Sequence, residues 1–364
     1  TGSVVEKAGP AALISYLISG IAAFLSALCY CEFSSLFPYS GSAYSYIYFT
    51  FGEFPAFVIG WNLILEYTVG ASSVIRSFTT YAKNFLPFKL DGINFRFINF
   101  KFDVDFYVLV VAVLFSLISL INIKKLKSVN KLSTFVSLTS LLFIIIIGLK
   151  YINKNFVSPF MPNGVSGIIS ASSSCFYSYI GFDIIASTAE EAVNPKRNVP
   201  ISIMLTITIC MLLYVSCTAI ITLIIPFDFF FADTTFITAF SYHKEFLGVF
   251  IVSIGSFASF FSCIIISFFP VPRILFAMSN DGLLPNFFGS NGSSSAIPKL
   301  NVLVSSLIIC LFSFVIPLEE LIDMMSIGTL TAYSMISLCV ILLRYNILEL
   351  PLPHKYDNNV IDQG

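Results

Sequence analysis

Long apolar stretches separated by short polar linkers form the pattern of this chain. An α-helix rises about 1.5 Å per residue, so about 20 apolar residues cross the hydrocarbon core of a bilayer. Runs of that length begin near Ala11, Phe54, Val104, Leu132, Val165, Pro200, Phe246, Leu300 and Leu321. The pattern therefore predicts an all-α polytopic membrane protein, with about nine full spans in a single transmembrane unit over residues 1–364.

Composition supports this fold class and excludes several functions. Of the 364 residues, 57% are hydrophobic and 11% are charged, which is outside the range of ordinary soluble domains. The formal net charge is −1, so the chain has no basic field for nucleic acid. The eight cysteines lie in or at the ends of apolar runs and indicate small core residues, and the two histidines lie outside those runs. We therefore expect no metal, no cofactor and no enzymatic activity.

One apolar run, residues 170–191, contains two residues that fit a membrane helix poorly. Gly181 weakens a helix, and the Asp183 carboxylate near the middle of the run costs about 2.5–3.5 kcal/mol on insertion scales. We predict that the helix breaks at Ile180–Gly181. The freed backbone groups and Asp183 then form half of a binding site at mid-depth in the membrane. The alternative is a continuous span in which Asp183 pairs with another helix.

A series of short motifs in this chain is specific in order and spacing, although each motif alone is weak. The motifs are Ala8-Gly9-Pro10-Ala11 with Cys29-Tyr30-Cys31-Glu32-Phe33, Gly60-Trp61-Asn62-Leu63, Tyr179-Ile180-Gly181-Phe182-Asp183 with Asn194-Pro195-Lys196-Arg197, Pro272-Arg273-Ile274-Leu275 with Asp281-Gly282-Leu283-Leu284-Pro285, and Met325-Ser326-Ile327-Gly328-Thr329-Leu330. Together they resemble the amino acid, polyamine and organocation transporter superfamily, and within it the cationic amino acid transporter family.

The resemblance implies a transporter core of two inverted five-helix repeats, in which helices one and six are discontinuous where substrate binds. Residues 1–151 would hold most of the first repeat and residues 165–344 the second. On this register Thr1 follows directly on the break in helix one, and Gly364 comes soon after helix ten. We therefore expect a fragment that lacks the start of helix one and the helices after ten.

The predicted break suggests how a substrate is held. The carbonyls of Tyr177, Ser178 and Ile180 would lose their helical partners and face the ammonium group of an amino acid. The resemblance points to the same positions for backbone contacts to the substrate amine. Tyr177 and Tyr179 are candidate aromatic gates or stacking partners for a cationic side chain, and ordinary packing is the alternative for both.

Two acids complete the candidate substrate-binding set. Asp183 starts the second half-helix, where the helix dipole favours a carboxylate. Its likeness to an acidic position linked to proton-dependent gating in some relatives gives it a second candidate role. Glu66 lies four residues after Asn62 on one helical face, and we expect it to favour cationic substrates. Its alternative is a pair with Arg76 or with another helix.

Further residues are candidates for the pathway and for a gate. Asn62, Ser256 and Ser259 are pathway candidates, although the serine spacing also suits close helix packing. Candidate inner-gate ion pairs, with solvated charges as the alternative, come from Glu190, Glu191, Lys196, Arg197, Arg273 and Asp281. Ser137 stands where some bacterial members of the family carry a lysine, which favours facilitated transport or exchange over lysine-based proton coupling.

The sequence thus predicts a secondary transporter that moves arginine, lysine and ornithine by alternating access. The alternatives are a broad or neutral amino acid permease and a non-transporting amino acid receptor on the same fold. We expect a multi-pass protein of the plasma membrane or of a vacuolar or lysosomal membrane. Its expected partners are the amino acid and the lipid bilayer, and protein partners are left open.

Overall fold

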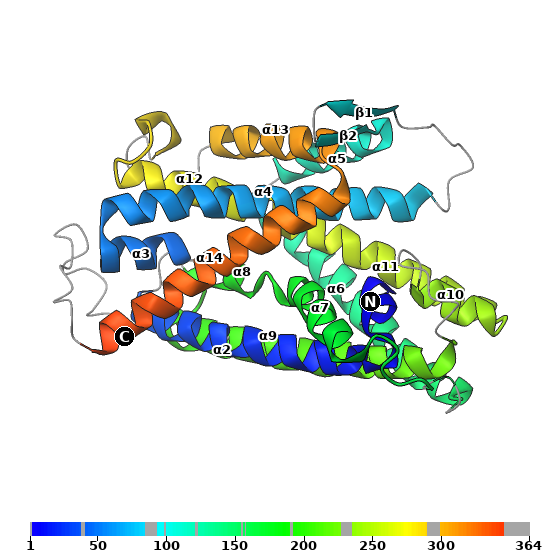
Figure 1. Cartoon of the computed structure of the whole chain (residues 1–364). Coiled ribbons are helices and arrows are strands. Elements are labelled where there is room, and N and C mark those ends of the chain that lie inside the picture. The colour runs from blue at the N-terminus through cyan, green and yellow to red at the C-terminus, as the bar shows by residue number, and fades with distance from the viewer. Residues whose placement is uncertain are drawn as a thin grey trace.

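The computed structural model is built almost entirely of helices (Figure 1). It describes residues 2–37, 41–83, 93–97, 100–120, 123–153, 156, 158–189, 192–226, 235–289 and 299–345. The helices are α1 (Gly2–Ala8), α2 (Ala12–Leu36), α3 (Ala43–Phe51), α4 (Glu53–Lys83), α5 (Phe106–Ser119), α6 (Ile123–Gly148), α7 (Gly164–Phe176), α8 (Phe182–Ser187), α9 (Pro195–Ile224), α10 (Thr235–Tyr242), α11 (Phe246–Ser267), α12 (Pro270–Asn280), α13 (Lys299–Val315) and α14 (Leu318–Arg344). Strands β1 (Ile93–Phe97) and β2 (Phe100–Val104) pair in antiparallel fashion.

All nine predicted apolar runs are helical, but only seven helical stretches among the described residues are long and apolar enough to cross a membrane. The other two, α5 and α13, are apolar helices of 14 and 17 residues. The number of full spans, about nine, therefore stays a prediction, with seven of the nine runs long enough among the described residues. For α13 the cause of the shorter length is local, since Pro317 disfavours helical geometry at the residue before it and the helix ends at Val315.

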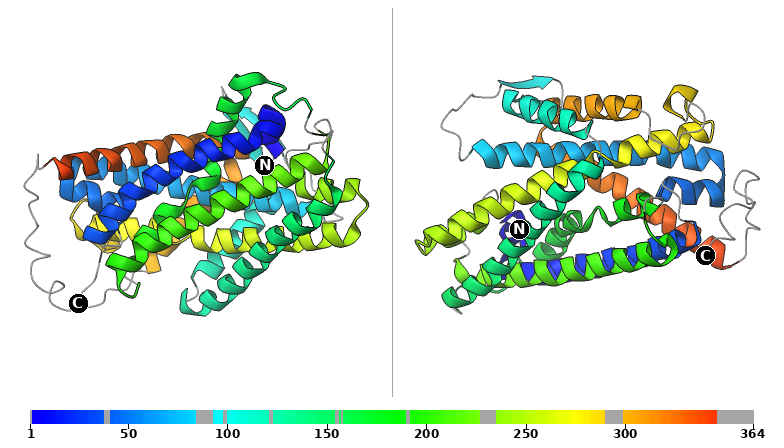
Figure 2. Two further views of the ribbon diagram at one scale, coloured as in Figure 1. Left: turned by 90° about the horizontal axis from the view of Figure 1, so that it is seen from below. Right: turned by 180° about the vertical axis from the view of Figure 1, so that it is seen from behind.

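The long helix α4 runs through the middle of the molecule and most of its length is buried. It packs against α3, α11, α12, α13 and α14. A second layer is formed by α2 and α9, which lie side by side in Figures 1 and 2. Helices α7 and α8 lie between this layer and α4, while α14 crosses obliquely (Figure 1). Seen from behind, α6 and α11 lie next to each other (Figure 2).

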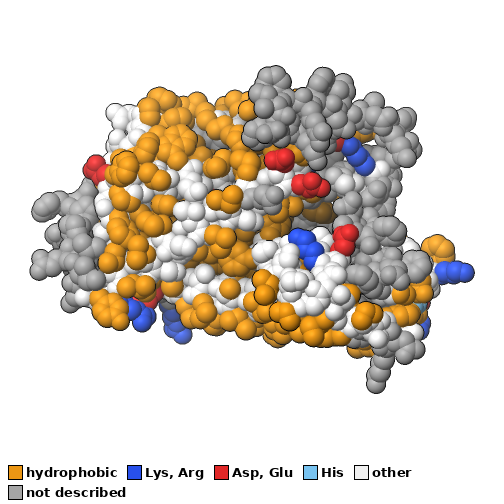
Figure 3. Space-filling view, in the orientation of Figure 1, with side chains coloured by type: hydrophobic (Ala, Val, Ile, Leu, Met, Phe, Trp, Pro, Cys, Tyr) orange, Lys and Arg blue, Asp and Glu red, His pale blue; other side chains and the backbone are white. Residues whose placement is uncertain are grey.

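The outer surface carries many apolar side chains. Leucine, isoleucine and phenylalanine side chains such as Leu25, Ile146 and Phe250 are more than half exposed. Figure 3 shows hydrophobic side chains spread across one face, with few charged groups among them. Exposed apolar surface on this scale is suited to lipid. Together with the seven apolar helices, it identifies a multi-pass membrane protein.

An aromatic core packs around α2, α3, α8 and α14. Tyr30 makes edge-to-face contacts with Phe182 and Tyr333 at centroid distances of 5.4 Å each. Phe33 stacks on Tyr46 at 5.0 Å. All five side chains are buried. This core fixes the start of α8 against α2 and α14, and thereby positions the segment where the membrane helix breaks.

Candidate functional site

The membrane helix breaks where the sequence predicted. Helix α7 ends at Phe176, one 3₁₀ turn covers Tyr177–Tyr179, and α8 begins at Phe182. Between them Ile180 is extended, with φ −68° and ψ 144°, and Gly181 has φ 113°. An L-residue rarely adopts that positive φ, so glycine is the residue that allows this turn. The alternative of a continuous span is wrong.

The backbone at the break differs from the prediction at one carbonyl. The Ile180 N–H donates to the Tyr177 carbonyl at 3.3 Å. The expectation that this carbonyl loses its partner is therefore wrong, because a 3₁₀ turn replaces the α-helical hydrogen bond with a tighter one. The roles of the Ser178 and Ile180 carbonyls remain predictions. On the other side of the break, the Ile184 N–H donates to the Gly181 carbonyl at 3.2 Å.

Asp183 lies in the first turn of α8, as expected, and its side chain is buried. The Tyr67 hydroxyl on α4 donates to Oδ2, and the Tyr333 hydroxyl on α14 donates to Oδ1 at 3.4 Å. The backbone carbonyl of Asp183 accepts from the Ser42 hydroxyl at 3.3 Å. This one residue therefore ties the half-helix α8 to α4, to α14 and to the residue preceding α3.

Glu66 is buried on α4 and faces α14. Its Oε1 accepts from the Thr329 hydroxyl at 2.6 Å, while its Oε2 is buried without a hydrogen-bond partner among the described residues. The Asn62 amide donates to the Gly328 carbonyl at 2.9 Å. A Cβ on Gly328 would lie 3.2 Å from the Glu66 Cβ, so glycine lets the two helices approach closely here.

Arg76, the suggested alternative partner of Glu66, is directed elsewhere. Its guanidinium donates to the carbonyls of Ser313 at 2.7 Å and Phe314 at 3.0 Å, at the end of α13. Glu66 instead bonds a neutral hydroxyl on α14. The pairing with Arg76 is therefore not supported, although a contact with another helix is present.

Both acids are linked to helices α4 and α14. Tyr67 directly follows Glu66 on α4 and reaches Asp183. On α14, Thr329 reaches Glu66 and Tyr333 reaches Asp183, and residues four apart lie on one helical face. The sequence alone does not single out these three partners. The available signal was a pair of hydroxyl-bearing residues four positions apart on α14 and a tyrosine beside a buried acid.

The two candidate gate tyrosines point in different directions. The Tyr177 hydroxyl lies 2.9 Å from the Ser73 hydroxyl on α4. Tyr179 is buried, donates to the Tyr16 carbonyl at 3.0 Å, and packs edge-to-face on Tyr214 at 5.4 Å. Tyr179 therefore fits the alternative of ordinary packing. Tyr177 faces α4, the helix that carries Glu66.

The structure divides the candidate inner-gate residues. Glu190 and Glu191 lie outside the described residues. Lys196 and Arg197 are exposed in the first turn of α9. Arg273 is buried on α12 and donates to the Ser187 carbonyl at 3.4 Å, and Asp281 accepts from the Tyr44 hydroxyl at 2.9 Å. A gate built from ion pairs among these residues stays a prediction.

The family model described as "Amino acid permease" matches residues 1–355. This chain belongs to the amino acid permease family. Among curated proteins, it is 33% identical over 97% of its length to "Cationic amino acid transporter 3, mitochondrial" of Arabidopsis thaliana, and covers 60% of that protein. It is 35% identical over 98% to "Cationic amino acid transporter 2, vacuolar" of Arabidopsis thaliana, covering 58%. It is 32% identical over 95% to "Cationic amino acid transporter 4" of Mus musculus, covering 56%.

This permease therefore spans less than two thirds of the length of these relatives. Membership of the family places it among transporters and not among enzymes. The names of the relatives do not agree on one membrane, since one is called mitochondrial and another vacuolar.

Two of the three pathway candidates lie together in this permease. Ser256 and Ser259 on α11 line a pocket of about 300 Å³ against α6. The third candidate, Asn62, lies on α4 beside Gly328 of α14. Ser137 contacts α11 directly, because its hydroxyl donates to the Gly255 carbonyl at 3.1 Å. Close approach of α6 and α11 occurs at Gly255, where an added Cβ would lie 1.9 Å from the Ser140 hydroxyl oxygen. The pathway role of Ser256 and Ser259 stays a prediction.

Proposed function

We propose that this chain forms the core of a secondary transporter that moves cationic amino acids, such as arginine, lysine and ornithine, across a membrane by alternating access. The observation that carries the proposal is the helix break at Ile180–Gly181. Two buried acids accompany it: Asp183 is hydrogen-bonded to α4, and Glu66 on α4 is hydrogen-bonded to α14. Transporters with discontinuous helices bind charged substrate groups at such breaks. The names of the relatives support the same substrate class.

The proposal includes the inverted repeat, with residues 1–151 in the first half and residues 165–344 in the second. Its support comes from the two short apolar helices. Helices α5 and α13 each directly precede the last long helix of their half of the proposed repeat, and they pack on each other and on α4. A repeat related by an axis in the membrane plane would bring equivalent helices together in this way.

In this proposal, the backbone at the break holds the amino acid end of the substrate. The carbonyls of Ser178 and Ile180 are suited to the ammonium group, while the Asp183 carboxylate lies in the first turn of α8. Tyr177 would cover the site from the side of α4.

Glu66 would select for a cationic side chain. Its Oε2 is buried without a partner among the described residues, and an unsatisfied buried polar group costs about 1–3 kcal/mol, or more when charged. An N–H group of a guanidinium or ammonium would satisfy that oxygen. A neutral side chain would leave it unpaired, so cationic substrates are favoured.

Uptake into liposomes tests the proposal. Radiolabelled arginine, lysine and leucine are supplied to the full-length protein with and without a pH gradient. We expect uptake of arginine and lysine above that of leucine, and little effect of the gradient. Leucine uptake without lysine uptake would exclude the cationic preference, and arginine binding without any uptake would indicate a receptor.

A further inference from the structure

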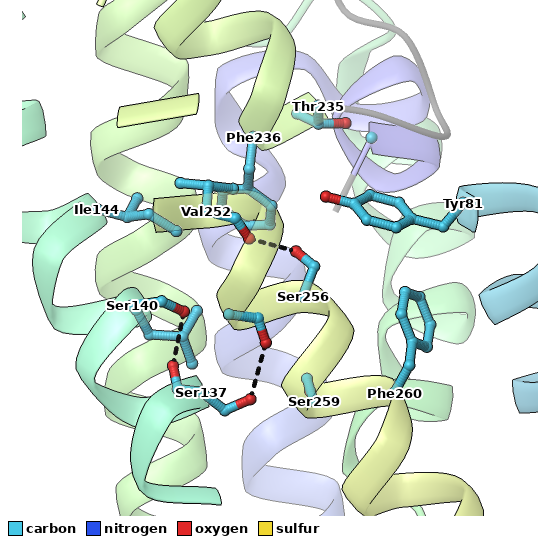
Figure 4. Close-up of a pocket in the computed structure, with 13 residues that line it drawn as sticks. Tyr81, Ser137, Ser140, Ile144, Thr235, Phe236, Val252, Ser256, Ser259 and Phe260 are labelled. Carbon is cyan, nitrogen blue, oxygen red and sulfur yellow. Dashed lines mark hydrogen bonds between the residues drawn. The ribbon is translucent and has the colours of Figure 1, made fainter. Parts of the chain in front are cut away.

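A pocket of about 300 Å³ lies between α6 and α11, closed at one side by the end of α4 (Figure 4). Sites for small molecules commonly measure about 300–1,000 Å³, so an amino acid side chain fits here. The serines at positions 137, 140, 256 and 259 line it, together with Tyr81 and Phe260. Its lining residues include no lysine, arginine, histidine, aspartate or glutamate among the part of the chain that the structure describes.

The serine hydroxyls of this pocket act as hydrogen-bond acceptors. Each hydroxyl has a single hydrogen, and three of these hydrogens are donated to backbone carbonyls. Ser137 donates to Gly255 at 3.1 Å, Ser140 to Ser137 at 2.8 Å, and Ser256 to Val252 at 2.9 Å. The oxygens retain their lone pairs. The pocket therefore suits a ligand group that is rich in N–H donors.

Aromatic rings on one side of the pocket further restrict the kind of ligand group that it can bind. Tyr81 and Phe260 lie on one side of the pocket, opposite Ser137 and Ser140 (Figure 4), with ring centroids 5.7 Å apart. A guanidinium stacks on aromatic faces, carries five N–H donors in one plane, and is more weakly hydrated than an ammonium. An ammonium would lose more hydration in a pocket that holds no carboxylate among its described lining residues. Both observations favour a guanidinium group.

We propose that this pocket is a second binding position, specific for the guanidinium group of an arginine-like substrate on its way to the helix break. The proposal rests on the proposed function, since it assumes that arginine is transported. The pocket is distinct from the Glu66 site. Tyr81 lies fifteen residues after Glu66 on α4, a separation of about 22 Å along the helix.

The position of the pocket suits a step before the main site. Ser73, which bonds the Tyr177 hydroxyl, precedes Tyr81 by eight residues on α4, or about 12 Å. Tyr81, at the edge of the pocket, therefore lies about two helical turns along α4 from the residue that bonds Tyr177, three positions before Ile180. Binding there would raise the local concentration of arginine beside the site without using either buried acid.

The test uses the full-length double variant Ser256→Ala, Ser259→Ala. Ser256 bonds a carbonyl of its own helix, so its removal breaks no contact between helices. We expect the KM for arginine uptake to rise about tenfold, equivalent to about 1.4 kcal/mol, and the KM for lysine to rise less than threefold. Tyr81→Leu should likewise raise the KM for arginine more than the KM for lysine. Ser253→Ala is the matched control, because Ser253 is also buried on α11 and donates to the Val249 carbonyl but does not line the pocket.

The possible outcomes separate the two proposals. Equal changes for arginine and lysine, or no change in either, would overturn the guanidinium site while leaving transport intact. If the wild-type protein takes up no arginine, the proposed function fails, and arginine binding in detergent decides the pocket. Loss of binding in the double variant but not in Ser253→Ala supports the pocket, and unchanged binding in both rejects it.

Discussion

The hydroxyl groups around Asp183 allow a graded test of how the broken helix is held. Tyr67, Tyr333 and Tyr30 are all buried tyrosines near α8, so replacing each with phenylalanine removes one hydroxyl and little else. The Tyr67 hydroxyl donates to Asp183 Oδ2, the Tyr333 hydroxyl reaches Oδ1 only at 3.4 Å, and the Tyr30 hydroxyl has no hydrogen-bond partner among the described residues.

These differences set the expected free energies of unfolding. A hydrogen bond to a charged group is worth about 1.5–3 kcal/mol, so Tyr67→Phe should destabilise the protein by about 2 kcal/mol. Tyr333→Phe should cost less than about 1 kcal/mol, because hydrogen bonds weaken at long distances. Tyr30→Phe is the matched control. It removes an unsatisfied buried hydroxyl, so stability should stay equal or rise.

The assay is reversible unfolding of the purified protein in mixed detergent, followed by helical circular dichroism. Each tyrosine variant is also made in an Asp183→Asn background. The cost of Tyr67→Phe should shrink in that background, because the charged acceptor is gone. If Tyr30→Phe costs as much as Tyr67→Phe, or if the cost of Tyr67→Phe is the same with and without the Asp183→Asn substitution, then ring packing and not the hydroxyl bond holds α8, and the reasoning is refuted.

Three further predictions concern single residues. Glu66→Gln should reduce arginine uptake more than neutral amino acid uptake in the liposome assay, and an equal loss of both would remove its selective role. Gly181→Ala should destabilise the protein by about 1–2 kcal/mol in the unfolding assay, because only backbone strain at φ 113° opposes it and the nearest atom to an added Cβ is 3.9 Å away. The Tyr151 hydroxyl, and after it the charge of Lys150, lowers the pKa of Glu245 below its usual 4.5, so the stabilisation from this carboxylate is present above pH 4.5 and is lost as the pH falls through the lowered pKa. Tyr151→Phe should therefore weaken the loss of stability in acid, as measured by thermal unfolding between about pH 3 and pH 6.

The helix break was predictable because its causes are local. Gly181 and Asp183 lie within three residues of each other, and both oppose a continuous membrane helix. The partners of the acids were not predictable in the same way. Tyr67 lies 116 positions from Asp183, Tyr333 lies 150, and Thr329 lies 263 from Glu66. Contacts at such separations depend on how whole helices pack, and periodicity within one helix does not specify that packing.

The lengths of the helices also show which features the sequence predicts and which it does not. Hydropathy placed every apolar run on a helix, but α5 and α13 are shorter than the other seven helical stretches because their ends are set by specific residues. Asp105 caps the start of α5 by accepting from the Tyr107 N–H at 3.0 Å, and Pro317 follows the end of α13. A window average of hydropathy does not register a single cap or proline.

The hydrogen-bond partners of Glu66 and Asp183 bear on the proposed preference for cationic substrates. Glu66 and Asp183 both receive hydroxyl groups, and within the described ranges neither forms an ion pair with lysine or arginine. A hydroxyl stabilises a carboxylate but does not cancel its charge. Buried acids are costly unless a positive charge lies near them, and a protein cation such as Arg76, which instead bonds α13 carbonyls, would have met that need permanently. Under the proposed function, the ammonium or guanidinium of the amino acid would supply that charge each time it binds.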